Sequence, residues 1–257
     1  GGRRDYWADA VRHKGAPMYE QVVAINIGLA MLLAMSLNII TGFAGQPTLG
    51  HAAFYGIGAY TSALLTAKAG WPFLLALPMA GLVAALVGVL LGLFSVRVRE
   101  DFLAVTTIGI NFVVVAIFQY VELFGASLGL AVPKPEIFGL RFGNTEILIL
   151  LVSLNILVYL FMRHLPKSWL GLALGGVRNE EEAAASLGVN PDHYKVFAFG
   201  IGTFIAGMTG SVYAHFMGFI SSTDFSFPVS VGVLSMAVLG GLGTVSWPLL
   251  GAIILTL

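Results

Sequence analysis

The polar residues that interrupt the apolar stretches of this chain are the ones whose chemistry could bind or conduct a solute. Amide, hydroxyl and imidazole groups can line a neutral pathway or gate, and they can equally cap a helix or bond one helix to another. His51 and Tyr55 are four residues apart, so they share one helix face. The candidate pathway or gate residues are Asn38, Gln46, Thr48, His51, Tyr55, Thr106, Thr107 and Asn111.

The familiar motifs of nucleotide binding and metalloprotease chemistry are missing from the chain. No Gly-Lys dipeptide occurs, so there is no Walker A loop, and no glycine pattern completes a dinucleotide-binding fingerprint. The H-E-x-x-H and S-x-x-K motifs are absent as well. With no cysteine, the chain has no thiolate metal site. We therefore expect a chain that is not an enzyme and that binds neither metal nor cofactor itself.

A second group of polar residues forms a charged segment, residues 166–195, between two long apolar blocks. Asn179 precedes three glutamates and three alanines, which predicts a short helix over 180–187 with Asn179 as its N-cap. Gly188 fits the left-handed position that follows a helix, and Asn190-Pro191 is a typical helix start. The segment therefore predicts two short helices, joined by a tight turn, outside a bilayer.

The composition predicts an integral membrane protein. Hydrophobic residues make up 58% of the 257 residues, charged residues only 10%, and the mean hydropathy is +0.90; a soluble domain has about 25% charged residues. The 32 glycines suit close helix packing in lipid. A formal net charge of zero argues against a polyanion-binding surface, so we expect no nucleic acid partner.

Blocks of roughly 20 apolar residues can cross a bilayer. The sequence predicts them at 21–41, 50–67, 72–96, 102–124, 146–164, 196–220 and 228–257, and the last one can divide into two pieces. If residues 166–195 are cytoplasmic, parity places 97–101 inside and residues 1–20, 68–71 and 125–145 outside. Counting Lys and Arg does not decide the orientation.

We expect one transmembrane domain over residues 21–257 and an external N-terminal segment over residues 1–20. That segment carries four basic residues, and the chain stops within the apolar run AIILTL. Both features predict that the natural chain continues beyond each end.

Two Gly/Pro breaks interrupt the apolar blocks in a similar way. Each reads G-x-x-G followed by P-x-L-G, with three extra residues in the second. Such breaks in corresponding halves are typical of transporter repeats, because irregular backbone at membrane depth must line a cavity or be buried in protein; a chance match stays open. The break residues are Gly42, Gly45, Pro47, Gly240, Gly243 and Pro248.

Glu122 is the one acidic residue that we expect within a span, near its outer end, where it would reach the membrane boundary. Ion-coupled transport usually needs buried carboxylates, and their scarcity weakens that alternative. An ion-coupled secondary transporter or a channel for a small polar solute nevertheless stays open as the second function.

Four stretches together resemble a known family: Ser36–Leu65, Phe102–Phe112, Gly176–Ala214 and Val238–Ala252. They are similar to the LivM-type permease subunits of branched-chain amino acid ABC importers, and the resemblance covers nearly all of residues 20–257. One departure is Ile110-Asn111, where family members often carry Glu at the second position. This departure weakens any inference about substrate from that helix.

The resemblance implies an all-α, polytopic transmembrane helix bundle, a type II-like ABC importer permease with discontinuous helices and a short cytoplasmic coupling-helix pair. It implies a LivH-like second permease, LivG-like and LivF-like ATPase subunits that hold ATP and Mg²⁺, and a periplasmic binding protein. The location would be the bacterial cytoplasmic (inner) membrane. The expected cargo is Leu, Ile or Val, with other amino acids, amides, urea and aromatic acids left open.

The family's coupling region, an Arg-x-x-Glu-x-Ala-Ala-type segment, falls within the charged segment. Through it, movements of the ATPases would reach the membrane helices. The expected coupling residues are Arg178, Asn179, Glu180, Glu181, Glu182, Ala183, Ala184, Leu187 and Gly188.

Overall fold

The computed structural model describes the backbone of residues 2–97, 100–137 and 140–256 and the side chains of residues 19–97, 102–136 and 142–256. The side chains of most of the predicted inner loop 97–101 and of the basic residues before position 19 lie outside this described part.

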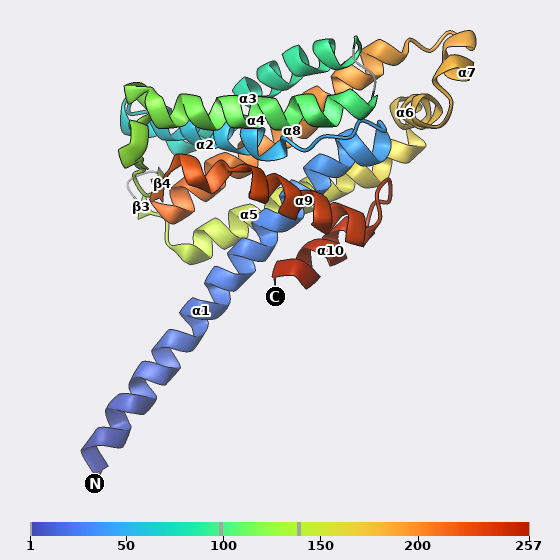
Figure 1. Ribbon diagram of the computed structural model, residues 1–257. Helices are drawn as coiled ribbons and strands as arrows, with labels where there is room; N and C mark the ends of the chain where they lie inside the picture. Colours follow the sequence, from blue (N-terminus) through green and yellow to red (C-terminus); the bar gives the residue numbers. More distant parts are fainter. Residues whose placement is uncertain (1, 98–99, 138–139, 257) are drawn as a thin grey trace.

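The chain is folded almost entirely as helices (Figure 1). In chain order the helical elements are α1 (Gly2–Leu37), the π-helix η1 (Asn38–Phe43), α2 (His51–Ala67), α3 (Phe73–Ser95), α4 (Glu100–Tyr120), the 3-10 helices η2 (Glu122–Phe124) and η3 (Ala126–Leu128), α5 (Asn144–His164), the 3-10 helix η4 (Leu165–Lys167), α6 (Trp169–Asn179), α7 (Glu181–Ser186), α8 (Pro191–Met217), the 3-10 helix η5 (Ser222–Phe225), α9 (Phe227–Gly240) and α10 (Trp247–Thr256).

Among the residues whose backbone is described, four two-residue strands, which the sequence did not predict, lie in the connections. β1 (Leu130–Ala131) pairs antiparallel with β4 (Phe219–Ile220), and β2 (Glu136–Ile137) pairs antiparallel with β3 (Leu140–Arg141). The β1–β4 pair joins the α4–α5 connection to the α8–α9 connection at one end of the bundle.

The predicted membrane class and all-α fold are confirmed. Within the described residues, six helical segments are long and apolar enough to cross a membrane: Tyr19–Phe43, Phe73–Ser95, Phe102–Tyr120, Asn144–Lys167, Pro191–Met217 and Ser222–Gly240. The predicted block 228–257 is two helices, α9 and α10. The block predicted over 102–124 was too long, since α4 ends at Tyr120 and Glu122 lies beyond the span.

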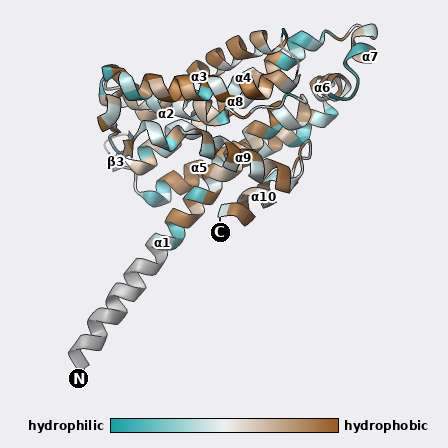
Figure 2. Ribbon diagram, viewed as in Figure 1, coloured by the Kyte–Doolittle hydropathy of each residue, from teal (hydrophilic) through white to brown (hydrophobic). Residues whose placement is uncertain are grey.

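Helix α8 packs against both α2 and α3, and small residues permit the close contact. A Cβ added at Gly88 of α3 would lie 2.0 Å from Thr203 Oγ1, and one added at Gly58 of α2 would lie 2.1 Å from Gly207 O. The outward faces are apolar, as Figure 2 shows for α3 and α4; Leu82 and Leu86 are among the exposed leucines. This pattern suits helices that face lipid or other membrane helices.

Candidate functional site

The first helix break begins with a π-helix. α1 passes into η1, which ends at Phe43, and residues 44–50 then run without regular structure to α2. Gly45 has a φ of +69°, a conformation that glycine adopts at little cost. Pro47 cannot donate a backbone hydrogen bond, so it suits an irregular stretch. The predicted break at Gly42, Gly45 and Pro47 is therefore present in the fold.

The second helix break separates α9 from α10. α9 ends at Gly240, Gly241 and Gly243 have φ of +95° and +80°, and α10 starts at Trp247 with Pro248 in its first turn. The missing N–H of Pro248 costs nothing there, because the first-turn N–H groups have no partner within the helix.

The two breaks meet in space. The amide of Asn38 donates to Thr244 O (2.7 Å) and accepts from Gly243 N (2.8 Å). A Cβ added at Gly42 would lie 2.5 Å from Gly243 N, so the two backbones touch. The sequence predicted Asn38 as a pathway residue; in the structure its amide lies between the breaks, where it pairs one backbone donor and one acceptor.

Arg178 of α6 completes this contact. Its Nη1 donates to Gly42 O, and a Cβ added at Gly243 would lie 2.0 Å from the same nitrogen. We call this contact of Asn38, Gly42, Gly243, Thr244 and Arg178 the break junction. It connects the charged segment to both helix breaks, although these parts are far apart in the sequence.

The charged segment contains one more helix than the sequence predicted. α6 extends from Trp169 to Asn179, capped by the Ser168 side chain, which accepts from Gly171 N. The prediction that Asn179 caps the next helix was therefore wrong: Asn179 is the last residue of α6, and Glu180 occupies the N-cap of α7 without a side-chain cap bond. The sequence did not predict α6, because its first eight residues, WLGLALGG, are apolar and rich in glycine.

Two predicted features of this segment are confirmed. Gly188 has a φ of +85° after α7. Asn190 caps the next helix through Asp192 N (3.1 Å), with Pro191 as its first residue. That helix is not short, as predicted, but is the spanning helix α8.

The short helix α7 is held on the bundle by one ion pair and one packed alanine. Lys195 Nζ donates to Glu181 Oε2; the lysine side chain is 9% exposed and the glutamate 44%. Ala184 is buried, and its Cβ lies 3.7 Å from the Cβ position that Gly176 would have. The remaining expected coupling residues lie on the exposed side: Asn179, Glu180, Glu182, Ala183, Leu187 and Gly188.

Most of the other candidate pathway residues join helices to one another. His51 Nε2 lies 2.7 Å from Ser36 Oγ, and Thr107 Oγ1 accepts from Leu49 N (3.0 Å). Gln46 Oε1 accepts from Ser95 Oγ (3.3 Å). All three side chains are buried, which favours the interhelical alternative for them.

Two candidates bond within their own segment. Thr48 is buried, and its hydroxyl accepts from Gly50 N at 3.5 Å. Thr106 is exposed on α4 and donates to Phe102 O in the preceding turn (2.8 Å). Thr106 is therefore exposed, whereas the other seven candidates are buried.

Tyr55 and Asn111 converge on the η5 turn. The Tyr55 ring lies 5.3 Å from those of Tyr213 and Phe225, and Asn111 Nδ2 donates to Phe225 O (3.2 Å). Next to this turn is a cavity of about 300 Å³ between α1, α2, α8 and α9, lined by Tyr55, Tyr213 and Asp224 among others. We call it the Asp224 cavity.

Sequence reasoning missed Asp224. The residue lies within the candidate span Ser222–Gly240, so the assumption that Glu122 is the acid within a span was wrong. A signal was present, because Ser221-x-x-Asp224 is a capping box: Ser221 N donates to Asp224 Oδ2 (2.9 Å).

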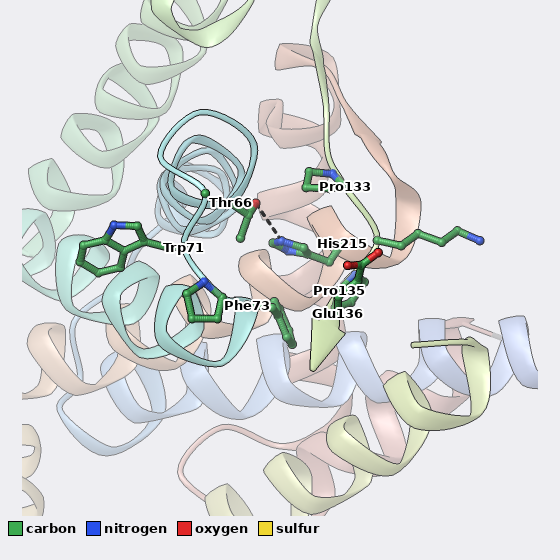
Figure 3. A pocket seen from close by; sticks show the side chains of 10 residues that line it. Thr66, Trp71, Phe73, Pro133, Pro135, Glu136 and His215 are labelled. Atoms are coloured by element: carbon green, nitrogen blue, oxygen red, sulfur yellow. Dashed lines mark hydrogen bonds between the residues drawn. The ribbon is translucent and has the colours of Figure 1, made fainter. Parts of the chain in front are cut away.

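A larger cavity, about 520 Å³, lies where α2 ends and α3 begins (Figure 3). His215 is buried in its wall, with Nε2 at 3.1 Å from Thr66 Oγ1 and Nδ1 donating to Ser211 O (2.8 Å). The Phe73 ring lies 4.6 Å from the imidazole. Since both ring nitrogens are bonded, His215 serves here to join α2 to α8.

Neither a hydrolase site nor a metal site emerges from the described residues. Gly125–Gly129 matches the letters G-x-S-x-G, but the catalytic motif needs a turn from a strand into a helix, and Ser127 lies here in a 3-10 helix that follows another. In that part of the chain no three His, Asp or Glu side chains gather as metal ligands would.

Comparison with known proteins supports a transport role. A family profile described as "branched-chain amino acid transport system / permease component" matches residues 22–257. The high-affinity branched-chain amino acid transport system permease protein LivM of Escherichia coli K12 is 35% identical over 88% of this chain, and that of Salmonella typhimurium is 34% identical over 91%.

The chain spans 59% and 61% of the length of these two LivM relatives. The LivH permease of E. coli K12 is 25% identical over 87% of this chain and 78% of the relative. No solved structure matches the chain.

Proposed function

The chain belongs to the family of branched-chain amino acid transport system permease components, and from this premise we propose that it is the LivM-like permease subunit of an ATP-driven importer in the bacterial inner membrane. The cargo is leucine, isoleucine or valine, the substrate class that the names of its relatives give. The chain moves the substrate; ATP and Mg²⁺ are held by separate LivG-like and LivF-like ATPase subunits. A LivH-like permease and a periplasmic binding protein complete the complex.

The break junction is the observation that carries this proposal. Arg178 belongs to the charged segment, and its guanidinium bonds the first break while lying against the second. A displacement of α6 therefore acts on both breaks at once. Breaks are the places where membrane helices can bend with little loss of hydrogen bonding, because their backbone bonds are already irregular.

The ion pair of α7 gives a second mechanical connection. Lys195 lies in the first turns of α8, so a partner that moves α7 also moves α8 through Glu181. The exposed surface of α6 and α7 carries Trp169, Leu172 and Leu187, which are 72%, 69% and 85% exposed. Apolar residues at this exposure suit a protein contact, and the ATPase subunit is the partner that the function requires.

The test is uptake by the complete complex, the two permeases and two ATPases in proteoliposomes with the binding protein outside. We expect leucine uptake only with ATP inside. A Gly-Ser replacement of residues 180–187 should abolish uptake while the ATPases still hydrolyse ATP. Uptake driven by an ion gradient without ATP would instead support the secondary transporter or channel, and would reject the importer.

Glu181→Lys and Glu182→Lys form a matched pair for the α7 contact. Both reverse one charge on α7, but only Glu181 pairs with Lys195. Breaking a buried pair costs about 3–5 kcal/mol, and less here because Glu181 is 44% exposed, so we expect uptake to fall about tenfold in Glu181→Lys. Glu182→Lys should stay near wild type; equal uptake by both variants would contradict the role of the ion pair.

A further inference from the structure

The Asp224 cavity combines one acidic group with an apolar wall. Asp224, Tyr55 and Tyr213 supply a carboxylate and two phenol hydroxyls, and Leu33, Val233 and Met236 are among the aliphatic residues around it. Its volume of about 300 Å³ is at the small end of the range of ligand pockets. A ligand that fits would be small, with a cationic group at one side and an aliphatic group at the other.

The carboxylate of Asp224 lies near the start of a candidate membrane span. Asp224 is the third residue of the segment Ser222–Gly240, and among the described residues no Lys, Arg or His forms an ion pair with it. Its Oδ2 accepts the Ser221 N–H, which leaves Oδ1 for another donor. A carboxylate oxygen beside a cavity can form a charge-assisted hydrogen bond with the cationic group of a ligand.

The position of Asp224 is fixed by the surrounding helices. Phe225, the next residue, is fully buried and packs against Tyr55, Tyr60 and Tyr213 with ring centroids 5.3 to 6.0 Å apart. Asn111 of α4 holds the carbonyl of Phe225. These contacts orient the η5 turn, so the carboxylate is held beside the cavity before any ligand arrives, as a preorganised site requires.

We infer that the Asp224 cavity is a binding site for the amino acid within the permease: Asp224 pairs with the α-ammonium group, and the aliphatic wall contacts the branched side chain. Asn26 also lines the cavity, and its amide would donate to the α-carboxylate. This inference rests on the proposed function, because it assigns the cargo of the importer to particular residues. It makes the permease itself selective for a primary ammonium group next to an aliphatic chain.

The absence of cysteine from the chain provides a direct test. Gly232 lines the cavity and Gly175 lies on α6, outside the candidate spans, and a Cβ added at either meets nothing within 4 Å. Gly232→Cys and Gly175→Cys are therefore a matched pair for labelling with a small methanethiosulfonate reagent. The protein would be the nucleotide-free complex whose other subunits lack reactive cysteines.

Leucine should slow labelling of Gly232→Cys at least about fivefold, a change of ~1 kcal/mol, and leave the labelling of Gly175→Cys unchanged. The acid 4-methylpentanoate, which is leucine without its ammonium group, should give no protection. Adding Asp224→Asn should remove the protection by leucine. The asparagine keeps an oxygen that can accept from Ser221 N, and assembly with the partner subunits checks its folding.

Equal labelling with and without leucine, or equal protection by leucine and 4-methylpentanoate, would overturn the inference. Protection that survives Asp224→Asn would do the same. The comparison of the two ligands on Gly232→Cys is decisive alone if Asp224→Asn fails to assemble. ATP-driven uptake with no protection rejects this site and leaves the importer intact, whereas protection without ATP-driven uptake rejects the importer.

Discussion

At the break junction the polar groups bond one another, whereas at the Asp224 cavity they surround a space. Asn38 uses both its amide nitrogen and its amide oxygen on the second break, and Arg178 bonds the first. Asp224 uses Oδ2 for Ser221 N, so its other carboxylate oxygen is left for a ligand, and Tyr55 and Tyr213 line the same cavity. Both regions consist of polar groups in a membrane protein. Of the two, only the Asp224 cavity has a polar atom left to bond a ligand.

This difference separates two tasks of a transporter. A joint that transmits movement must be internally satisfied, since any unpaired buried group would make it unstable. A binding site must retain unsatisfied groups, because the ligand satisfies them. Substitutions in the two regions should therefore differ in effect, from loss of uptake at the junction to a weaker substrate affinity at the cavity.

Asn38→Leu should damage the break junction most. It leaves Gly243 N and Thr244 O without their partner, at about 1–3 kcal/mol for each buried group. We expect a lower melting temperature of the purified complex and almost no ATP-driven uptake. Asn155→Leu is the control, because Asn155 also bonds a neighbouring helix, through Gly28 O, but away from the breaks. If both variants lose uptake in proportion to stability, the junction has no special role.

Arg178→Gln should have an intermediate effect. A hydrogen bond from a charged donor contributes about 1.5–3 kcal/mol, and glutamine is too short to replace the guanidinium. Uptake should fall about tenfold while ATP hydrolysis by the complex continues. Lys167→Gln, which removes an exposed positive charge from the same segment, should transport normally. Loss of hydrolysis together with uptake would argue against a role in coupling.

Tyr213→Phe should have the smallest effect, and it should concern substrate. The ring contacts with Tyr55 and Phe225 remain, and one hydroxyl beside the cavity is lost. One hydrogen bond contributes about 1 kcal/mol, so the KM for uptake should rise about fivefold with an unchanged maximal rate. A change in the maximal rate alone would indicate that Tyr213 acts in the conformational change and not in substrate binding.

The separate elements of the break junction were visible in the sequence, but their contact was not. Gly42, Gly45, Pro47, Gly240, Gly243 and Pro248 marked both breaks, and Asn190-Pro191 marked the start of α8. Asn38 and Arg178 were assigned to different tasks, because 140 positions separate them along the chain. Hydrogen bonds between such distant residues follow from packing and leave no periodic signal.

Other predictions were wrong because a local sequence pattern was compatible with two different structures. Asn179 followed by three glutamates matches a helix start, yet α6 extends through Asn179, because Ser168 caps it and apolar residues such as Leu174 bury one face. Asp224 was overlooked because residues 221–227 resemble a connection between two apolar blocks. The β1–β4 pair and the packing of Phe225 draw this connection into the bundle.

The sequence by itself determined the membrane class, the helical fold, the positions of the breaks and the family, because each depends on composition, periodicity or residues adjacent in the chain. Tertiary structure alone decided that the two breaks touch, that Arg178 holds them, and that Asp224 lies beside a cavity. These facts depend on which helix faces pack together. In lipid that packing is set by close steric fit and hydrogen bonds between distant segments. The hydropathy pattern of the sequence does not predict these contacts.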